Sequence, residues 1–409
     1  MKESIHIQNF GPLRDVRIDD IKPLTVLIGD SASGKSMLMK VITMMRQAYQ
    51  RENIESYLRN ANIISESDID KIKLWTLLPD SGSVADIKHM FTLYPNLDGE
   101  NIEIDYTVRM PSGKEYISNH NYRYLIPCDH IDKADISFSQ EAFVAETRSM
   151  IPTWSLYGAR SSGIDLGYCF NETFSYFSEA TDSIKEQPLD YIGMKMEVTT
   201  DSTQKYFSIY PNDGDYGVSL GSGIVSSGIQ ASAPLMTIVR YFAREFSFTK
   251  PFQRSVLDYL LNEDLLTEFR PEVNLKDLKK YVHLYIEEPE LSLDPKTQCL
   301  FINDLIREAF YRGDNKRPDD GRQLGLMFAT HSPYILNHLN VLLKASYYEK
   351  ARESYPYINP DEIAVYRLHN GVVHSLMATD NLSGHTVIDT IDLSDTMEDI
   401  FNAYDNIKK

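Results

Sequence analysis

Short runs dominated by apolar residues recur along this chain, and each is followed by polar or glycine-rich residues. Residues 24–28, 282–286 and 324–329 form such runs, which are typical of strands buried on both faces. Near the N-terminus, residues 4–8 and 16–18 alternate between apolar and polar side chains, which predicts half-buried strands. Apolar residues at helical spacing follow the first run, at Met37, Leu38, Val41, Ile42, Met45 and Ala48. Strands and helices that alternate in this way predict an α/β fold.

The remaining pattern predicts two further hairpins, three more helices and a C-terminal unit. Turn residues at 111–113 separate two strand-like segments at 101–110 and 114–118. A second hairpin is expected at 195–210, and helices are expected at about 228–248, at 250–280 and at 296–311. The end of the chain predicts a helix, one hairpin at 364–376 and a terminal amphipathic helix. Residues 50–100 are mixed, and glycines interrupt any periodicity in 135–190.

Composition indicates a folded globular protein. The chain has 409 residues, of which 42% are hydrophobic and 24% charged, so one two-lobed unit or two domains are expected. No stretch approaches the roughly 18 apolar residues of a membrane span, and the N-terminus enters a strand pattern directly, unlike a signal peptide. Three scattered cysteines argue against a disulfide framework. We therefore expect a cytoplasmic protein that does not contact a membrane.

Charge adds one restriction on partners. The net charge is −18, from 41 Lys and Arg against 59 Asp and Glu, whereas proteins that neutralise many phosphates carry the opposite sign. The cluster of Lys276, Lys279 and Lys280 is interpreted as a solvated helix face. Tight nucleic-acid binding by one copy alone is thus disfavoured, although a basic groove formed between two copies would not show in a net charge.

A phosphate-binding loop follows the first apolar run. The motif G-x-x-x-x-G-K-[ST] is matched by Gly29, Asp30, Ser31, Ala32, Ser33, Gly34, Lys35 and Ser36. Backbone N–H groups of such a loop surround phosphates, and glycine permits their close approach. Lys35, expected in a solvent-facing loop, would reach the β- and γ-phosphates, and the Ser36 hydroxyl would coordinate Mg²⁺. The sequence therefore predicts an ATP and Mg²⁺ site between a strand and a helix.

Polar residues also follow the other two apolar runs. Glu287 and Glu288 come directly after 282–286, and His331 comes after 324–329. Because the carboxyl ends of parallel strands meet at one edge of a sheet, these side chains should lie near the phosphate loop. We expect Glu287 to contribute to the Mg²⁺ shell and Glu288 to deprotonate the attacking water. His331 would contact the γ-phosphate, whereas the other histidines are interpreted as structural.

A serine–glycine turn opens the helix at about residue 228. Its candidate ligand-binding residues are Ser226, Ser227, Gly228 and Gln230. A turn of this kind places free N–H groups at a helix N-terminus, where anions bind. Alone it is weak evidence, because such turns are common. Its position between the phosphate loop and the acidic strand strengthens the assignment.

Taken in order, these motifs resemble the ABC ATPases, in the soluble branch with OLD, RecF and SMC heads. Within that branch they are similar to stand-alone AAA-family ATPases of prokaryotic antiphage modules. The resemblance spans about residues 5–335 and rests on 9–11, 29–36, 226–230, 286–290 and 330–333. It implies an α/β ABC-type P-loop NTPase with a RecA-like core sheet, N-terminal antiparallel strands and an inserted helical lobe. The expected divisions are a first ATPase segment at 1–130, a helical lobe with the signature at 131–280, and a second ATPase segment at 281–409.

The same resemblance implies a head-to-tail dimer, or a higher oligomer, that ATP closes. The signature of one copy would meet the γ-phosphate bound by the other, and Asp294 would cross the interface. Val225, Ile229 and Glu287 depart from the residues usual in this family. Gln140 is a candidate for the glutamine that links Mg²⁺ to the helical lobe. The group that stacks on adenine is not assigned.

Several relatives fit the sequence poorly. The separation of Ser36 and Ser226 exceeds that in transporter subunits, and residues 50–190 lack the heptads of an SMC arm. The segment after Pro333 is too short for the Toprim nuclease domain of OLD proteins. We favour the sensor ATPase of an antiphage system, similar to AriA or PtuA, with a separate nuclease or toxin as effector and a phage protein or DNA as trigger. The alternatives are a DNA-clamping repair or chromosome-maintenance ATPase like RecF, and an assembly protein in which ATP is structural.

Overall fold

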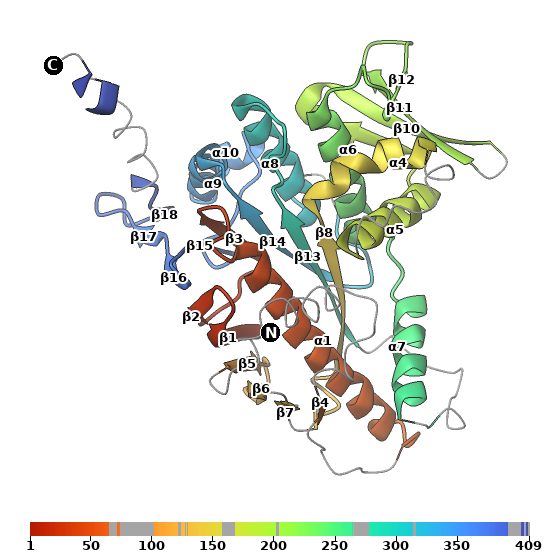
Figure 1. The fold of residues 1–409 in the computed structure, drawn as a ribbon, viewed down its shortest axis with the longest axis vertical. Helices are drawn as coiled ribbons and strands as arrows, with labels where there is room; N and C mark the ends of the chain where they lie inside the picture. Colours follow the sequence, from red (N-terminus) through yellow and green to blue (C-terminus); the bar gives the residue numbers. More distant parts are fainter. Residues whose placement is uncertain are drawn as a thin grey trace.

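One large mixed sheet organises the protein (Figure 1). The structure is a computed structural model, and it describes residues 1–64, 72–73, 102–121, 124–126, 128, 130–157, 168–201, 204–263, 265, 278–313, 316–391, 402–404 and 406–407. Twelve of the strands within these ranges join in the order β4-β7-β6-β5-β1-β2-β16-β15-β3-β14-β13-β8. The α/β class predicted from the sequence is therefore confirmed.

The part of the sheet at the β8 end of this order is parallel. It consists of β15 (Ile363–His369), β3 (Leu24–Gly29), β14 (Gln323–Thr330), β13 (Lys279–Glu287) and β8 (Ser137–Val144). Since these strands run in one direction, their carboxyl ends share one edge of the sheet. The phosphate loop, the acidic motif Glu287–Glu288 and His331 all lie at that edge.

The expected antiparallel strands occupy the other side of this sheet. They are β1 (Lys2–Phe10), β2 (Leu13–Ile18), β5 (Glu103–Arg109), β6 (Glu115–Asn121), β7 (Tyr124–Ile126) and β4 (Ile72–Lys73). Turn residues 111–113 join β5 to β6, as the sequence predicted. β16 (Val372–Ser375) pairs with β15 and with β2, and so connects the two parts of the sheet.

The sheet has a hydrophobic core on each face. Successive residues of one strand point to opposite faces, so Val26 joins the core on one side and Leu27 the core on the other. The first face is covered by α8 (Pro295–Ala309) and α9 (Pro333–Ala345), and the second by α1 (Lys35–Asn60) and the strands β1 and β5. Two-sided burial explains why β3, β13 and β14 are nearly continuous apolar runs.

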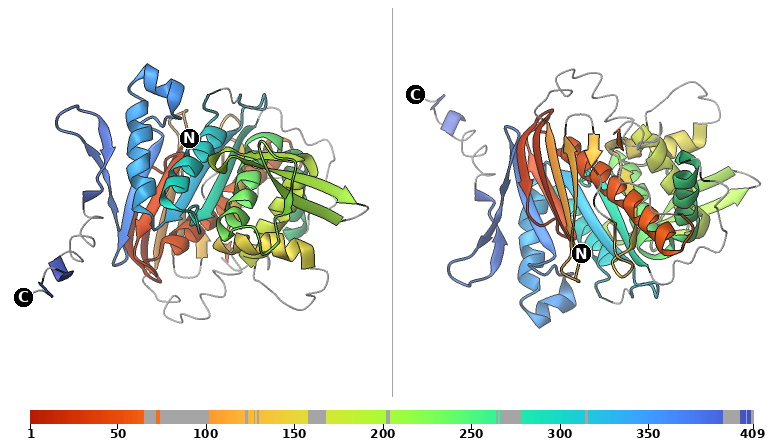
Figure 2. Two further views of the ribbon diagram at one scale, coloured as in Figure 1. Left: turned by 90° about the horizontal axis from the view of Figure 1, so that it is seen from above. Right: turned by 90° about the horizontal axis from the view of Figure 1, so that it is seen from below.

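A second, smaller lobe is inserted between β8 and β13 (Figure 1). Its helices are α4 (Ile151–Tyr157), α5 (Tyr168–Ser183), α6 (Ser227–Arg240) and α7 (Thr249–Asn262), with 3-10 turns at Glu146–Met150 and Asp190–Ile192. A separate antiparallel sheet contains β9 (Glu186–Leu189), β10 (Met194–Asp201), β11 (Gln204–Pro211) and β12 (Val218–Ser219). This sheet lies at the opposite end of the molecule from the C-terminal hairpin (Figure 2).

Four details differ from the sequence predictions or lie beyond them. β8 lies in residues 135–190, for which the sequence predicts no clear element, because polar residues interrupt the apolar pattern of this strand. The helix at 228–248 leaves α geometry after Arg240, where a π turn covers Tyr241–Glu245. After α10 (Glu349–Ser354) and the predicted hairpin, a second small hairpin pairs β17 (Met377–Thr379) with β18 (Thr386–Ile388). The predicted terminal helix lies largely outside the described residues.

None of the described helices is both long and apolar enough to cross a membrane.

A buried polar network joins both parts of the sheet to α1. Arg46 Nε donates to Glu3 at 2.7 Å and its Nη1 donates to the Tyr285 hydroxyl at 2.8 Å. The Tyr106 hydroxyl donates to Glu3 at 2.6 Å, and Tyr285 donates to Glu141 at 2.7 Å. Burial acts to raise the pKa of Glu3, but Arg46, His283 and Tyr106 together outweigh it and the pKa falls below the usual value. Glu3 therefore stays ionised beside the guanidinium.

Removing the cation of this network should destabilise the fold. Arg46→Met is expected to lower the free energy of unfolding by about 3–5 kcal/mol, because it leaves the buried Glu3 carboxylate unpaired. Glu3→Gln combined with Arg46→Met should recover part of that loss, since the double variant no longer leaves the Glu3 carboxylate unpaired. Denaturant unfolding measures both variants. A loss below about 1 kcal/mol for Arg46→Met would mean that the pair is not a buried ion pair in solution.

Candidate functional site

The phosphate loop has a backbone that only small residues can adopt. It connects the end of β3 to the start of α1, as predicted, with left-handed φ angles of 61° at Ala32 and 103° at Gly34. A Cβ at Gly34 would lie 2.9 Å from Leu13 Cδ2, and one at Gly29 would lie 2.3 Å from the Leu368 carbonyl oxygen. Packing against backbone thus requires glycine at position 29, and the left-handed φ favours it at position 34, in addition to phosphate access.

Lys35 is folded back into this loop. Its Nζ donates to the carbonyl oxygens of Gly29 and Asp30, each at 2.8 Å. Burial lowers the pKa of Lys35, while the nearby charges of Asp30, Glu288 and Glu290 oppose this shift. The side chain is only 7% exposed, so the expectation of a solvent-facing position was wrong. Ser36 follows on the first turn of α1 and lines the same cavity.

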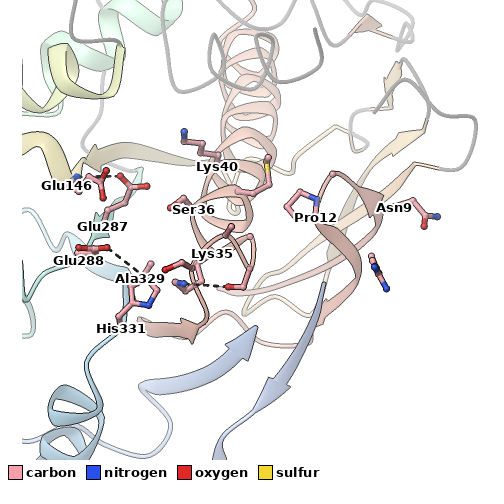
Figure 3. Close-up of a pocket in the computed structure, with 17 residues that line it drawn as sticks. Asn9, Pro12, Lys35, Ser36, Lys40, Glu146, Glu287, Glu288, Ala329 and His331 are labelled. Atoms are coloured by element: carbon pink, nitrogen blue, oxygen red, sulfur yellow. Dashed lines mark hydrogen bonds and ion pairs between the residues drawn. The ribbon is translucent and has the colours of Figure 1, made fainter. Parts of the chain in front are cut away.

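Three carboxylates face the phosphate loop across a cavity of about 920 Å³. Glu287 and Glu288 end β13, and Glu146 follows the end of β8; its backbone N–H donates to Glu287 Oε2 at 3.4 Å. In Figure 3 these three carboxylates lie on one side of the cavity, with Lys35 and Ser36 on the other. Burial and the charges of Glu287 and Glu288 raise the pKa of Glu146.

Glu288 has an unusual backbone conformation. Its φ is 42°, in the left-handed region that a non-glycine residue rarely adopts. Its N–H donates to the Ala329 carbonyl oxygen at 2.9 Å, which ties the turn to the end of β14. Such strain persists only where surrounding contacts hold it, and it is common at active sites.

His331 and Glu288 meet in the cavity. His331 Nε2 lies 4.0 Å from Glu288 Oε1, and both side chains are about one-third exposed, at 40% and 34%. Glu290, which sequence reasoning did not single out, accepts hydrogen bonds from the Thr330 hydroxyl at 2.6 Å and from the His331 N–H at 2.8 Å. It therefore fixes the histidine strand end to the acidic turn.

The signature residues lie elsewhere in the same copy. None of Ser226, Ser227, Gly228 and Gln230 lines the cavity. Ser226 caps α6 by accepting from the Ile229 N–H, and both Ser226 and Ser227 are exposed. Gln230 donates to the carbonyl oxygens of Ser222 and Val225, at 3.1 and 3.2 Å, so its amide is engaged within its own loop.

Gly228 and Asp294 have structural contacts within the copy. A Cβ at Gly228 would lie 2.6 Å from the Ser292 carbonyl oxygen, so this glycine is buried against the segment after the acidic turn. Asp294 caps α8 by accepting from the N–H groups of Lys296 and Thr297, at 3.1 and 3.2 Å. A substitution at Gly228 would thus disturb its own chain, which makes Ser227 the better probe of an interface.

The structure adds residues that sequence reasoning missed. Gln140 lies in the middle of β8, where it pairs with Val282, and does not line the cavity, so it was the wrong candidate. Glu146, beyond the carboxyl end of that strand, lines the cavity instead. Recognition of β8 would have pointed to it, since each central strand carries its polar residues just past this end. The β1–β2 turn and the next turn of α1 contribute Asn9, Gly11, Pro12, Arg14 and Lys40.

The donor groups fit ATP and Mg²⁺. Ser36, Glu287 and Glu288 present the hard oxygen atoms that Mg²⁺ prefers. The loop glycines leave its backbone accessible to phosphates, and the cavity volume suits a nucleotide.

Comparison with known structures gives distant similarities. An SMC head domain from Thermotoga maritima aligns over 91% of this chain and 97% of its own, at 10% identity and a TM-score of 0.36. The recombination mediator protein RecF, in a structure described as RecF-ATPrS in the RecFOR pathway, aligns over 92% of this chain and 98% of its own, at 9% identity and a TM-score of 0.35. An Smc head domain from Pyrococcus furiosus bound to the C-terminal domain of ScpA aligns over 100% and 99%, at 8% identity and a TM-score of 0.31.

Sequence comparison identifies the family. No curated protein shows significant similarity to the sequence. Residues 1–216 match the family described as AAA ATPase domain, a range that includes the phosphate loop and Glu146, while Glu287, Glu288 and His331 lie beyond it. This match covers more than half of the chain and agrees with the phosphate-loop geometry. The chain belongs to the AAA ATPase domain family and is an ATP-hydrolysing enzyme.

Proposed function

We propose that two copies of this ATPase face each other head to tail and enclose ATP between them. The observation that carries this proposal is the separation of the motifs within one copy. The phosphate cavity includes none of residues 226–230, whereas Ser226 and Ser227 are exposed at the N-terminus of α6. A helix N-terminus attracts anions through its free N–H groups and its dipole. A second copy would bring this end of α6 to the γ-phosphate.

Each residue of the cavity has a role in this proposal. Lys35 and the loop N–H groups hold the β- and γ-phosphates, and Ser36 and Glu287 hold Mg²⁺. When bound, Mg²⁺ neutralises charge on the phosphates. Glu288 takes the proton of the attacking water, and His331, 4.0 Å away, contacts the γ-phosphate. ATP closes the dimer and hydrolysis opens it, so the nucleotide state acts as a conformational switch.

We further propose that this switch controls a separate nuclease or toxin in a prokaryotic antiphage system. The support is the resemblance of its motifs to those of stand-alone antiphage ATPases. The net charge of −18 also disfavours the alternative of a DNA clamp. Co-purification of the native complex followed by mass spectrometry should recover an effector protein. ATP-dependent binding of duplex DNA, with repair or replication proteins in the complex, would instead support the clamp.

Mixing two inactive variants tests the shared site. Ser227→Glu places a carboxylate where the partner's γ-phosphate would dock, and like charges repel. The same carboxylate favours the N-terminus of α6, so the fold should be retained. Ser227→Glu and Glu288→Gln should each hydrolyse ATP poorly. In a mixed dimer one site carries both changes and the other none, so up to about a quarter of wild-type turnover should return in an equal mixture.

Ser227→Gln is the matched control, because it has nearly the same size without the charge. It should retain most of the wild-type turnover by itself, without being mixed with a second variant. ATP affinity of Ser227→Glu, measured by calorimetry, should equal that of the wild type, since the phosphate loop is untouched. A mixture that stays inactive, together with a Glu288→Gln variant that remains monomeric with ATP, would show that the site is not shared between copies.

A further inference from the structure

Arg148 is buried beside the catalytic edge of the sheet without lining the cavity. It lies in the turn Glu146–Met150 after β8 and is 0% exposed. Its Nη1 donates to the carbonyl oxygens of Ala145, at 3.1 Å, and Glu287, at 2.6 Å, and its Nη2 donates to that of Glu288. Its Nε donates to the Ala231 carbonyl oxygen at 3.2 Å. One guanidinium thus connects β8, the acidic turn and α6.

This arrangement depends on the shape of arginine. Burying a cation is costly unless its donors are satisfied, and a guanidinium satisfies several carbonyls at once through its planar fork. Two of these carbonyls belong to Glu287 and Glu288, at the point where Glu288 adopts a left-handed φ of 42°. Fixing both carbonyls fixes the peptide planes, and therefore the direction in which the Glu288 side chain leaves the backbone.

The fourth contact reaches the signature helix. Ala231 lies in α6 shortly after its N-cap, Ser226. Gly228 in the same turn packs against the Ser292 carbonyl oxygen, in the segment that follows the acidic turn. A movement of the N-terminus of α6 would therefore displace Arg148 and, through it, the backbone of Glu287 and Glu288.

We propose that Arg148 is a positioning residue that couples phosphate docking on α6 to the alignment of Glu288 in the same copy. The inference rests on the proposed head-to-tail dimer. In that dimer α6 serves the ATP site of the partner, whereas Glu288 serves the copy's own site. Docking at one site thus aligns the base at the other, and the two sites hydrolyse ATP cooperatively. The mixture of Ser227→Glu and Glu288→Gln should therefore regain less turnover than the quarter that independent sites would give.

Two substitutions test Arg148 directly. Arg148→Lys keeps the charge but loses the fork, and Arg148→Ala leaves a space that methylguanidinium can fill. Both should bind ATP within about threefold of wild-type affinity, because the phosphate loop is intact. Turnover should fall about 100-fold, the usual effect of a misplaced base. The Hill coefficient for ATP should fall to about 1, and methylguanidinium should restore turnover to the alanine variant.

Arg322 supplies a matched control. It is also buried, and it also donates to two carbonyl oxygens, those of Phe242 and Phe246, at 2.9 and 2.6 Å. However, Arg322 neither lines the cavity nor contacts the turn of Glu287 and Glu288. Arg322→Ala should lower the thermal stability while leaving turnover per folded molecule and the Hill coefficient unchanged. Methylguanidinium should not change its turnover. If the loss of any buried arginine had these effects, turnover and the Hill coefficient would fall in the Arg148 and Arg322 variants alike.

Hydrogen exchange in proteins that keep Arg148 tests the proposal even if the Arg148 variants do not fold. In Glu288→Gln, ATP should slow hydrogen exchange across 286–293, and adding Ser227→Glu should remove that protection. Equal protection in both proteins would overturn the coupling, as would a folded Arg148→Lys with wild-type turnover and Hill coefficient. If Glu288→Gln stays monomeric with ATP, the dimer itself is refuted; if it dimerises, these results refute the role of Arg148 alone.

Discussion

Glu288→Gln is expected to bind ATP and to hydrolyse it about 100 to 10,000 times more slowly than the wild type. The amide has the shape of the carboxylate but cannot accept the proton of the attacking water. Its surroundings should persist, because the Glu288 backbone is held by Ala329 and Arg148 through main-chain atoms. Single-turnover hydrolysis measures the chemical step, and light scattering should show the dimer accumulating with ATP.

Glu197→Gln is a suitable control for this change. Glu197 is exposed to nearly the same degree, at 32% against 34%, and pairs with Lys195 on β10, away from the cavity. Its turnover should match the wild type. If Glu288→Gln itself stays within about threefold of wild-type turnover, a barrier change below about 0.7 kcal/mol, Glu288 is not the base.

Lys35→Ala should weaken ATP binding by at least about 100-fold, or about 2.7 kcal/mol. Lys35 is the cation of the phosphate loop, and charge-assisted hydrogen bonds to phosphate are among the strongest that proteins make. Because Nζ also donates to the Gly29 and Asp30 carbonyl oxygens, we expect a stability loss of about 1–2 kcal/mol as well. Calorimetry with ATP and thermal unfolding separate the two effects.

Lys205→Ala is the control that separates the loss of ATP binding from the loss of a lysine hydrogen-bonded to a backbone carbonyl oxygen. Lys205 Nζ donates to the Ser178 carbonyl oxygen at 2.6 Å and is likewise largely buried, but it belongs to the inserted lobe. This variant should lose some stability and keep its ATP affinity. A folded Lys35→Ala with wild-type ATP affinity would refute the assignment of 29–36 as the phosphate loop.

The sequence was sufficient for the elements whose signal is local. The apolar runs that became β3, β13 and β14 are buried on both faces, so each can be read without its neighbours. The phosphate loop is likewise contiguous, since its glycines, lysine and serine act within one turn. The order of these segments was enough for the α/β class, and the loop was enough to expect an ATPase.

Only the tertiary structure decided which distant residues meet at the sheet edge. β8 was missed because its polar Glu141 is satisfied by Tyr285, a partner 144 positions away, so its strand pattern is not visible locally. Glu146 and Arg148 were missed with it, since their position follows from where β8 ends. Gly228 reads as a free anion-binding turn, yet the fold buries it against Ser292. Contacts between separate segments depend on which strands pair and how helices pack, and a local sequence pattern does not determine either. Strands, helices and the phosphate loop, in contrast, follow from residues adjacent in the chain.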